Sequence, residues 1–294
     1  MSDEEIDGVR HLLTSLPRPT SLAERRVRLD TVASVDGVSP DIAFETVDLG
    51  SCEGEWSLAP GSDPSKVLLF FHGGGYCSGS IRSHRGMVSE TGRAAKVRTL
   101  AVGYRLAPEN PFPAALDDAL AAFAFLLRHG IAASRIAIAG DSAGGGISLA
   151  TMVRLRDSGG PLPGCAWLVS PWTDLEMTGA TLDSKAAIDP LIHREYLEEL
   201  ASAYVAGADR RNPLVSPLCA DLAGLPPVLV QVGSAETLLD DSVRIAGRLG
   251  AADVPVTLEV WPHMIHAWHL WSARLTAGRR AIASAGAFIA SHLG

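Results

Sequence analysis

The chain has few cysteines and no long apolar run. Only four of its 294 residues are cysteine, and they are widely scattered without a C-x-x-C spacing. We therefore expect reduced thiols rather than a disulfide framework. The longest nearly pure apolar run, 119–127, is too short to cross a bilayer, so the sequence predicts no membrane insertion.

A positive excess of charge is also missing. Acidic residues outnumber basic ones by 33 to 25, giving a net charge of −8, which disfavours nucleic acid and anionic membranes as partners. The first residues, 1–5, are acidic and lack the apolar core of a secretory signal, so a cytoplasmic protein is expected. The composition, 47% hydrophobic and 20% charged, is that of a globular protein with ample core.

Apolar runs and helical stretches alternate along the chain. Six runs are expected to be strands: 67–71, 98–104, 135–139, 165–170, 228–232 and 256–261. Two further strands, 42–48 and 52–59, are predicted to pair antiparallel, while 114–129, 147–155, 194–204 and 273–293 are predicted helices. This alternation predicts an α/β protein in which helices flank a mostly parallel sheet of eight strands. We expect one domain, 1–294, with a helical cap formed by 1–30 and the strand-free insertion 172–210.

The pentapeptide Gly140-Asp-Ser-Ala-Gly144 lies between a predicted strand and a predicted helix. A G-x-S-x-G in this context is typical of a nucleophile elbow, a tight and strained turn in which the flanking positions must lack side chains. The turn would present the hydroxyl of Ser142 at the N-terminal end of a helix, where developing negative charge is favoured. An idle serine in a glycine-rich turn is the alternative.

A serine hydroxyl is a weak nucleophile, so a base, an orienting acid and an oxyanion site are needed. His72-Gly-Gly-Gly75 follows a predicted strand and could supply backbone N–H groups at Gly73 and Gly74, with a further N–H at Ala143. A flexible loop or a phosphate cradle would also use glycines. The loop lacks the Gly-Lys-Ser/Thr and the G-x-G-x-x-G of phosphate-binding loops.

Three histidines, His263, His266 and His269, follow the last predicted strand. Their regular spacing could suggest a metal, but the H-E-x-x-H pattern and an accompanying acidic or cysteine cluster are missing. Position relative to the strand end favours His266 as the general base, with the other two as surface or packing residues.

The acid is expected after the strand at 228–232, where Glu236, Asp240 and Asp241 all qualify by charge. Glu236 lies nearest the strand end. Asp240 and Asp241 are expected in the first turn of the next helix, where a carboxylate favours the helix dipole. Spacing alone gives Glu236 only a modest advantage.

Four motifs together carry a resemblance over nearly the whole chain: His72-Gly-Gly-Gly75, Tyr104-Arg-Leu-Ala-Pro-Glu109, Gly140-Asp-Ser-Ala-Gly144 and Met264-Ile-His266. With them the sequence resembles the bacterial hormone-sensitive-lipase-like (family IV) esterases of the α/β-hydrolase superfamily. The resemblance implies that Ser142 is the nucleophile and His266 the base. It also implies oxyanion donors at Gly73, Gly74 and Ala143.

The family usually places its acid in an Asp-Pro-Leu-x-Asp segment. The matching residues here are Glu236-Thr-Leu-Leu-Asp240, so the resemblance implies Glu236 as the acid and Asp240 at the helix start. It further implies a cap built from N-terminal helices and a mid-chain insertion, and a homodimer through the last strand. No metal or organic cofactor is implied.

The resulting hypothesis is a carboxylesterase that hydrolyses short, uncharged esters by acyl transfer through Ser142, His266 and Glu236. An amidase or peptidase would use the same three residues. A non-catalytic ligand-binding protein of this fold is disfavoured, because each of the three positions carries competent chemistry.

Overall fold

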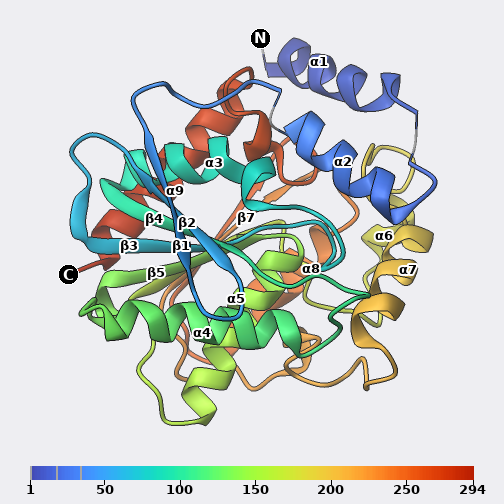
Figure 1. Ribbon diagram of the computed structural model, residues 1–294. Helices are drawn as coiled ribbons and strands as arrows, with labels where there is room; N and C mark the ends of the chain where they lie inside the picture. Colours follow the sequence, from blue (N-terminus) through green and yellow to red (C-terminus); the bar gives the residue numbers. More distant parts are fainter. Residues whose placement is uncertain (1, 18, 34) are drawn as a thin grey trace.

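The computed structural model describes residues 2–17, 19–33 and 35–294, and its centre is an eight-stranded sheet (Figure 1). The strands are β1 Ala43–Asp48, β2 Glu53–Leu58, β3 Asp63–Phe71, β4 Val97–Gly103, β5 Ile136–Asp141, β6 Cys165–Val169, β7 Val228–Gly233 and β8 Val256–Trp261. Their order is β1-β2-β4-β3-β5-β6-β7-β8. β2 runs antiparallel to both β1 and β4, and the remaining neighbours are parallel. The predicted α/β architecture is confirmed.

Helices cover both faces of the sheet (Figure 1). They are α1 Ser2–Ser15, α2 Leu22–Ala33, α3 Ile81–Ala95, α4 Ala114–Arg128, α5 Ala143–Asp157, α6 Thr181–Ser184, α7 Arg194–Val205, α8 Leu239–Ala251 and α9 Thr276–His292. Short 3₁₀ turns, η1 Ala133–Arg135, η2 Pro217–Cys219 and η3 Trp268–Trp271, complete the elements. α3 and α9 pack on one face, and α4, α5 and α8 pack on the other.

The central strand β3 shows why two layers form. Leu69 and Phe71 point into the cluster beneath α4 and α5, whereas Leu68 and Phe70 point into the cluster beneath α3 and α9. All four side chains are fully buried. Because successive side chains of a strand face opposite ways, a continuous apolar run is buried on both faces, and each such side chain contributes about 1.5–3 kcal/mol.

The structure moves three predicted boundaries. α5 begins at Ala143 instead of Ile147, since the run of glycines hides the first turn from a sequence pattern. β3 starts at Asp63, four residues before the apolar run, where its register with β4 shifts. The closing helix begins at Thr276, after the separate turn η3.

The segments predicted to form the cap lie along one side of the molecule, where α1, α2, α6 and α7 gather (Figure 1). An ion pair of 2.8 Å between Arg25 and Glu199 joins α2 to α7. Arg26 ties α2 to the body, because it donates to the carbonyl of Cys77 at 2.8 Å and pairs with Glu109. Met1 and Arg18 of the predicted cap segment 1–30 lie outside the described residues.

Candidate active site

Ser142 sits on a strained turn between β5 and α5. Its backbone angles, φ 53° and ψ −120°, are ones that a side-chain-bearing residue rarely adopts. The turn is closed so tightly that a Cβ at Gly144 would lie 1.9 Å from the carbonyl oxygen of Phe71, and one at Gly140 would lie 2.3 Å from the Gly144 backbone. The two glycines are therefore required by packing, as the G-x-S-x-G pattern predicts.

His266 and Glu236 come together at the carboxyl end of the sheet. The distance from His266 Nδ1 to Glu236 Oε1 is 3.1 Å. The other oxygen, Oε2, accepts from the hydroxyl of Ser170 at 2.8 Å and from the N–H of Gly233 at 2.9 Å. Burial opposes protonation of His266, but the hydrogen bond and charge of Glu236 outweigh it and raise the pKa of His266. The imidazole is thereby oriented and its protonated form stabilised.

Ser170 has no part in the sequence motifs. It follows β6, and its backbone also has a positive φ of 44°. Its hydroxyl donates to Glu236 and accepts from the N–H of Ala267, next to His266. Ser170 thus links Glu236 to the loop that carries His266, a position that the parallel pairing of β6 with β7 creates.

The other two histidines lie apart from this arrangement. His263 is exposed, whereas His269 is buried and contacts Gln231 Oε1 through Nε2 at 2.9 Å. Burial lowers the pKa of His269 to about 3, so the ring is neutral near pH 7. Within the described residues, no three His, Cys, Asp or Glu side chains gather in a way that could hold a metal ion.

The two competing carboxylates serve backbone groups of the insertion. Asp240 accepts from the N–H of Thr181 at 3.1 Å. Asp241 accepts from the N–H groups of Thr173 at 2.8 Å and Asp174 at 2.9 Å, and burial raises the pKa of Asp241 to about 7. Among the described residues, neither carboxylate makes a hydrogen bond with His266, which contacts Glu236 instead.

The glycine loop departs from the prediction at one position. The N–H of Gly73 donates to Asp141 Oδ1 at 2.8 Å, so it is not available to an oxyanion. Gly74 and Gly75 line the cavity above Ser142. In the described part of the chain, no hydrogen bond uses the N–H groups of Gly74, Gly75 or Ala143. Gly73 as an oxyanion donor is therefore corrected, because a backbone N–H directed at a buried carboxylate is already satisfied.

His84 is a second functional candidate that the motifs do not reveal. Its Nε2 lies 3.1 Å from Asp141 Oδ1, the same oxygen that holds Gly73. Burial alone would raise the pKa of Asp141, but His84 outweighs it and holds that pKa below its usual value. Asp141, which directly precedes Ser142, is therefore held by His84 and in turn holds the glycine loop through Gly73.

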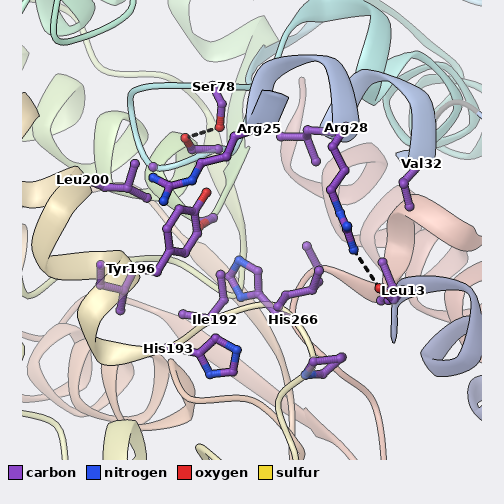
Figure 2. Close-up of a pocket in the computed structure, with 18 of the residues that line it drawn as sticks. Leu13, Arg25, Arg28, Val32, Ser78, Ile192, His193, Tyr196, Leu200 and His266 are labelled. Atoms are coloured by element: carbon purple, nitrogen blue, oxygen red, sulfur yellow. Dashed lines mark hydrogen bonds between the residues drawn. The ribbon is translucent and has the colours of Figure 1, made fainter. Parts of the chain in front are cut away.

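A cavity of about 530 Å³ opens above Ser142 and His266. Its walls come from four regions: α1 and α2 with the residues between them, the glycine loop with the nearby His84, the segment 190–200, and the segment 266–271. Figure 2 shows His266 at the centre, with Tyr196 and Leu200 of α7 on one side and Leu13 and Val32 of the N-terminal helices on the other. The cavity is of a size that suits a small organic molecule.

Comparison with known proteins agrees with this geometry. Residues 68–270 match the family model described as the alpha/beta hydrolase fold. An acetyl-hydrolase of Streptomyces hygroscopicus is 42% identical over 100% of this chain and 99% of its own length. A crystal structure of an esterase from the bacterial hormone-sensitive lipase family is 43% identical, with a TM-score of 0.96 over 99% of both chains. The chain belongs to the hormone-sensitive-lipase-like esterases.

An esterase of Acinetobacter venetianus is a more distant relative, 32% identical over 94% of this chain and 91% of that protein. Membership of this esterase family makes the chain a serine hydrolase with the α/β-hydrolase fold. None of the helices in the described part of this esterase is long and apolar enough to cross a membrane.

The structure also explains the remaining motif of this esterase family, Tyr104–Glu109. The hydroxyl of Tyr104 donates to the carbonyl of His72 at 2.7 Å, which supports the glycine loop from below. Arg105 pairs with the buried Asp118 of α4 at 2.8 Å. Glu109 holds Arg26 of α2. The motif therefore joins the glycine loop, the body and the N-terminal helices without touching the reacting groups.

Proposed function

We propose that this esterase hydrolyses short, uncharged carboxylic esters with Ser142 as nucleophile, His266 as base and Glu236 as acid. The hydrogen bond of 3.1 Å between His266 Nδ1 and Glu236 Oε1 carries the proposal. It engages Nδ1 and leaves Nε2 to accept a proton, and His266 lines the same cavity as Ser142. In the first step Nε2 takes the proton of Ser142 as Oγ attacks the ester carbonyl. Glu236 stabilises the imidazolium that forms.

The oxyanion site we propose uses the N–H groups of Gly74, Gly75 and Ala143. Gly74 has a φ of 113°, which a residue with a side chain rarely adopts, and a Cβ there would lie 2.2 Å from the carbonyl oxygen of Ser78. Each well-placed donor lowers the barrier by about 3–4 kcal/mol in comparable sites. Water then attacks the acyl-enzyme, and His266 acts again as base.

The preference for short chains rests on the walls of the cavity. Leu200 of α7 packs so closely on the glycine loop that a Cβ at Gly75 would lie 2.2 Å from its Cδ1. Of the cationic residues on the wall, Arg25 donates to Glu199, and Arg28 donates to the carbonyl of Leu13 (Figure 2). A long acyl chain would therefore contact the predicted cap segments 1–30 and 172–210. A negatively charged acyl chain would have to compete with the groups that Arg25 and Arg28 already bind.

A series of nitrophenyl esters of increasing acyl length, with the matched nitroanilide of the best acyl group, tests this function. We expect kcat/KM to fall once the chain exceeds the cavity and the anilide to be hydrolysed far more slowly than the ester. A rate that rises steadily with chain length, or that jumps at an emulsion interface, would overturn the short-chain assignment. Equal rates on ester and anilide would instead make the protein an amidase.

A further inference from the structure

Asp189 is a buried carboxylate in the insertion, between α6 and α7, and the mechanism above does not use it. Its Oδ1 accepts from the N–H of Leu191 at 2.9 Å and from the N–H of Ile192 at 3.0 Å. Its Oδ2 accepts from the N–H of Thr237 at 2.8 Å and from the hydroxyl of the same residue at 3.1 Å. A carboxylate withdrawn from water is costly unless donors satisfy it, and here four donors do so.

The two oxygens of Asp189 serve two different parts of the site. Leu191 and Ile192 line the cavity above Ser142. Thr237 directly follows Glu236, the residue that contacts His266. One carboxylate therefore joins the wall that meets the substrate to the loop that carries the acid.

Resting on the function proposed above, we infer that Asp189 is a positioning residue that holds the Glu236 loop and the cavity wall at 190–192 in one arrangement. The insertion thus takes part in catalysis as well as in shaping the cavity. A displacement of about 1 Å of a supporting group can lower the rate about 100-fold, so loss of the contacts of Asp189 should have a measurable effect on kcat.

The charge of Asp189 adds an observable that a purely structural contact lacks. Three carboxylates act on His266: Glu236 from the loop after β7, Asp189 from the insertion and Asp141 from β5. Burial opposes them, yet together they raise the pKa of His266. Because the base must be unprotonated to accept the serine proton, removal of one carboxylate should move the acidic limb of the rate profile to lower pH.

Thr181, at the start of α6, provides a matched control because it contacts the same loop. Its hydroxyl donates to the carbonyl of Thr237 at 2.8 Å and accepts from the N–H of Asp240 at 2.9 Å. Like Asp189, it clasps the loop from the insertion, but it carries no charge. Thr181→Val should therefore lower the thermal midpoint and leave the acidic limb where it is in the wild-type protein.

The experiment measures kcat and kcat/KM against pH with a neutral ester for the wild-type protein, Asp189→Asn and Thr181→Val. For Asp189→Asn we expect a kcat on the plateau about 10- to 100-fold lower, together with an acidic limb displaced to lower pH. An acidic limb that coincides with that of the wild-type protein, or an unchanged kcat, overturns the inference.

Two further variants keep the result decisive. Asp189→Glu retains the charge and lengthens the reach, so its kcat should fall while its acidic limb stays at the wild-type pH. If Asp189→Asn does not fold, a displaced limb in Asp189→Glu overturns the inference. His266→Ala separates the two proposals: full activity of this variant overturns the triad and the inference together, whereas an inactive His266→Ala with an unaffected Asp189→Asn overturns the inference alone.

Discussion

The loops after β5 and after β7 carry the proposed nucleophile and the proposed acid, and they are built in opposite ways. The β5 loop is fixed by close backbone packing: Gly140 and Gly144 let it close around Ser142, against the carbonyl of Phe71, in a conformation that few residues adopt. The β7 loop is held from outside, by Ser170 after β6 and by Thr181 and Asp189 of the insertion.

This difference separates two ways of placing a reactive group. A strained turn fixes its serine through sterics, so its geometry depends on a few neighbouring residues. A loop clasped by distant side chains depends on hydrogen bonds, each worth about 1 kcal/mol net, and on the packing of another segment. Side-chain changes in the segment 172–210 are therefore expected to affect the proposed acid, which Thr181 and Asp189 support, more than the proposed nucleophile.

The largest loss of activity should come from a change in the loop after β5. Ser142→Ala removes a hydroxyl without altering the glycines that shape the turn, so we expect an intact fold and a turnover about 10⁶-fold lower. Ser148→Ala is the control, because it deletes a buried hydroxyl that donates to Gly144 within the same helix. Retention of more than a few per cent of activity by Ser142→Ala would exclude Ser142 as the nucleophile.

A smaller loss of activity is expected from a change in the loop after β7. Glu236→Gln preserves shape but removes the charge that orients His266 and stabilises its protonated form, so turnover should fall about 10⁴-fold. Circular dichroism and the thermal midpoint should show that the variant is folded. An active Glu236→Gln would mean that another carboxylate serves His266.

The smallest effect is expected next to it, at the start of α8. Asp240→Asn removes a first-turn charge that contacts Thr181, and we expect a loss of about 0.3–1 kcal/mol in the free energy of unfolding. Activity per folded molecule should stay near that of the wild-type protein. A catalytically dead Asp240→Asn beside an active Glu236→Gln would exchange the roles of the two residues.

The same contrast explains what could be predicted from the sequence. The elbow needs glycine at two fixed positions on either side of Ser142, so a pattern of five consecutive residues predicts its structure directly. The apolar runs of β3, β5, β6 and β7 predict the centre of the sheet, because they are covered on both faces, whereas β8 at the edge is only partly buried. The start of α5 is hidden by glycines with low helix propensity, and docking against the sheet overrides that propensity.

Other parts of the site depend on residues that are distant in the sequence. Spacing alone leaves Glu236, Asp240 and Asp241 open, since the contacts that distinguish them come from the insertion and from His266. The engagement of Gly73 by Asp141 is hidden for the same reason, because it joins the ends of two neighbouring parallel strands. The predicted homodimer stays a prediction, with β8 at the sheet edge where a partner strand would pair.

The order of the elements along the sequence also sets the order in which a newly made chain acquires its site residues. β8 is the last strand to be synthesised, and it joins the sheet beside β7 at the edge. His266 lies beyond β8, so the elbow of Ser142 is synthesised well before the proposed base. A serine without a base is a weak nucleophile, so on the proposed mechanism Ser142 stays unreactive until His266 has been added. Hydrolysis therefore reports the completion of folding rather than its beginning.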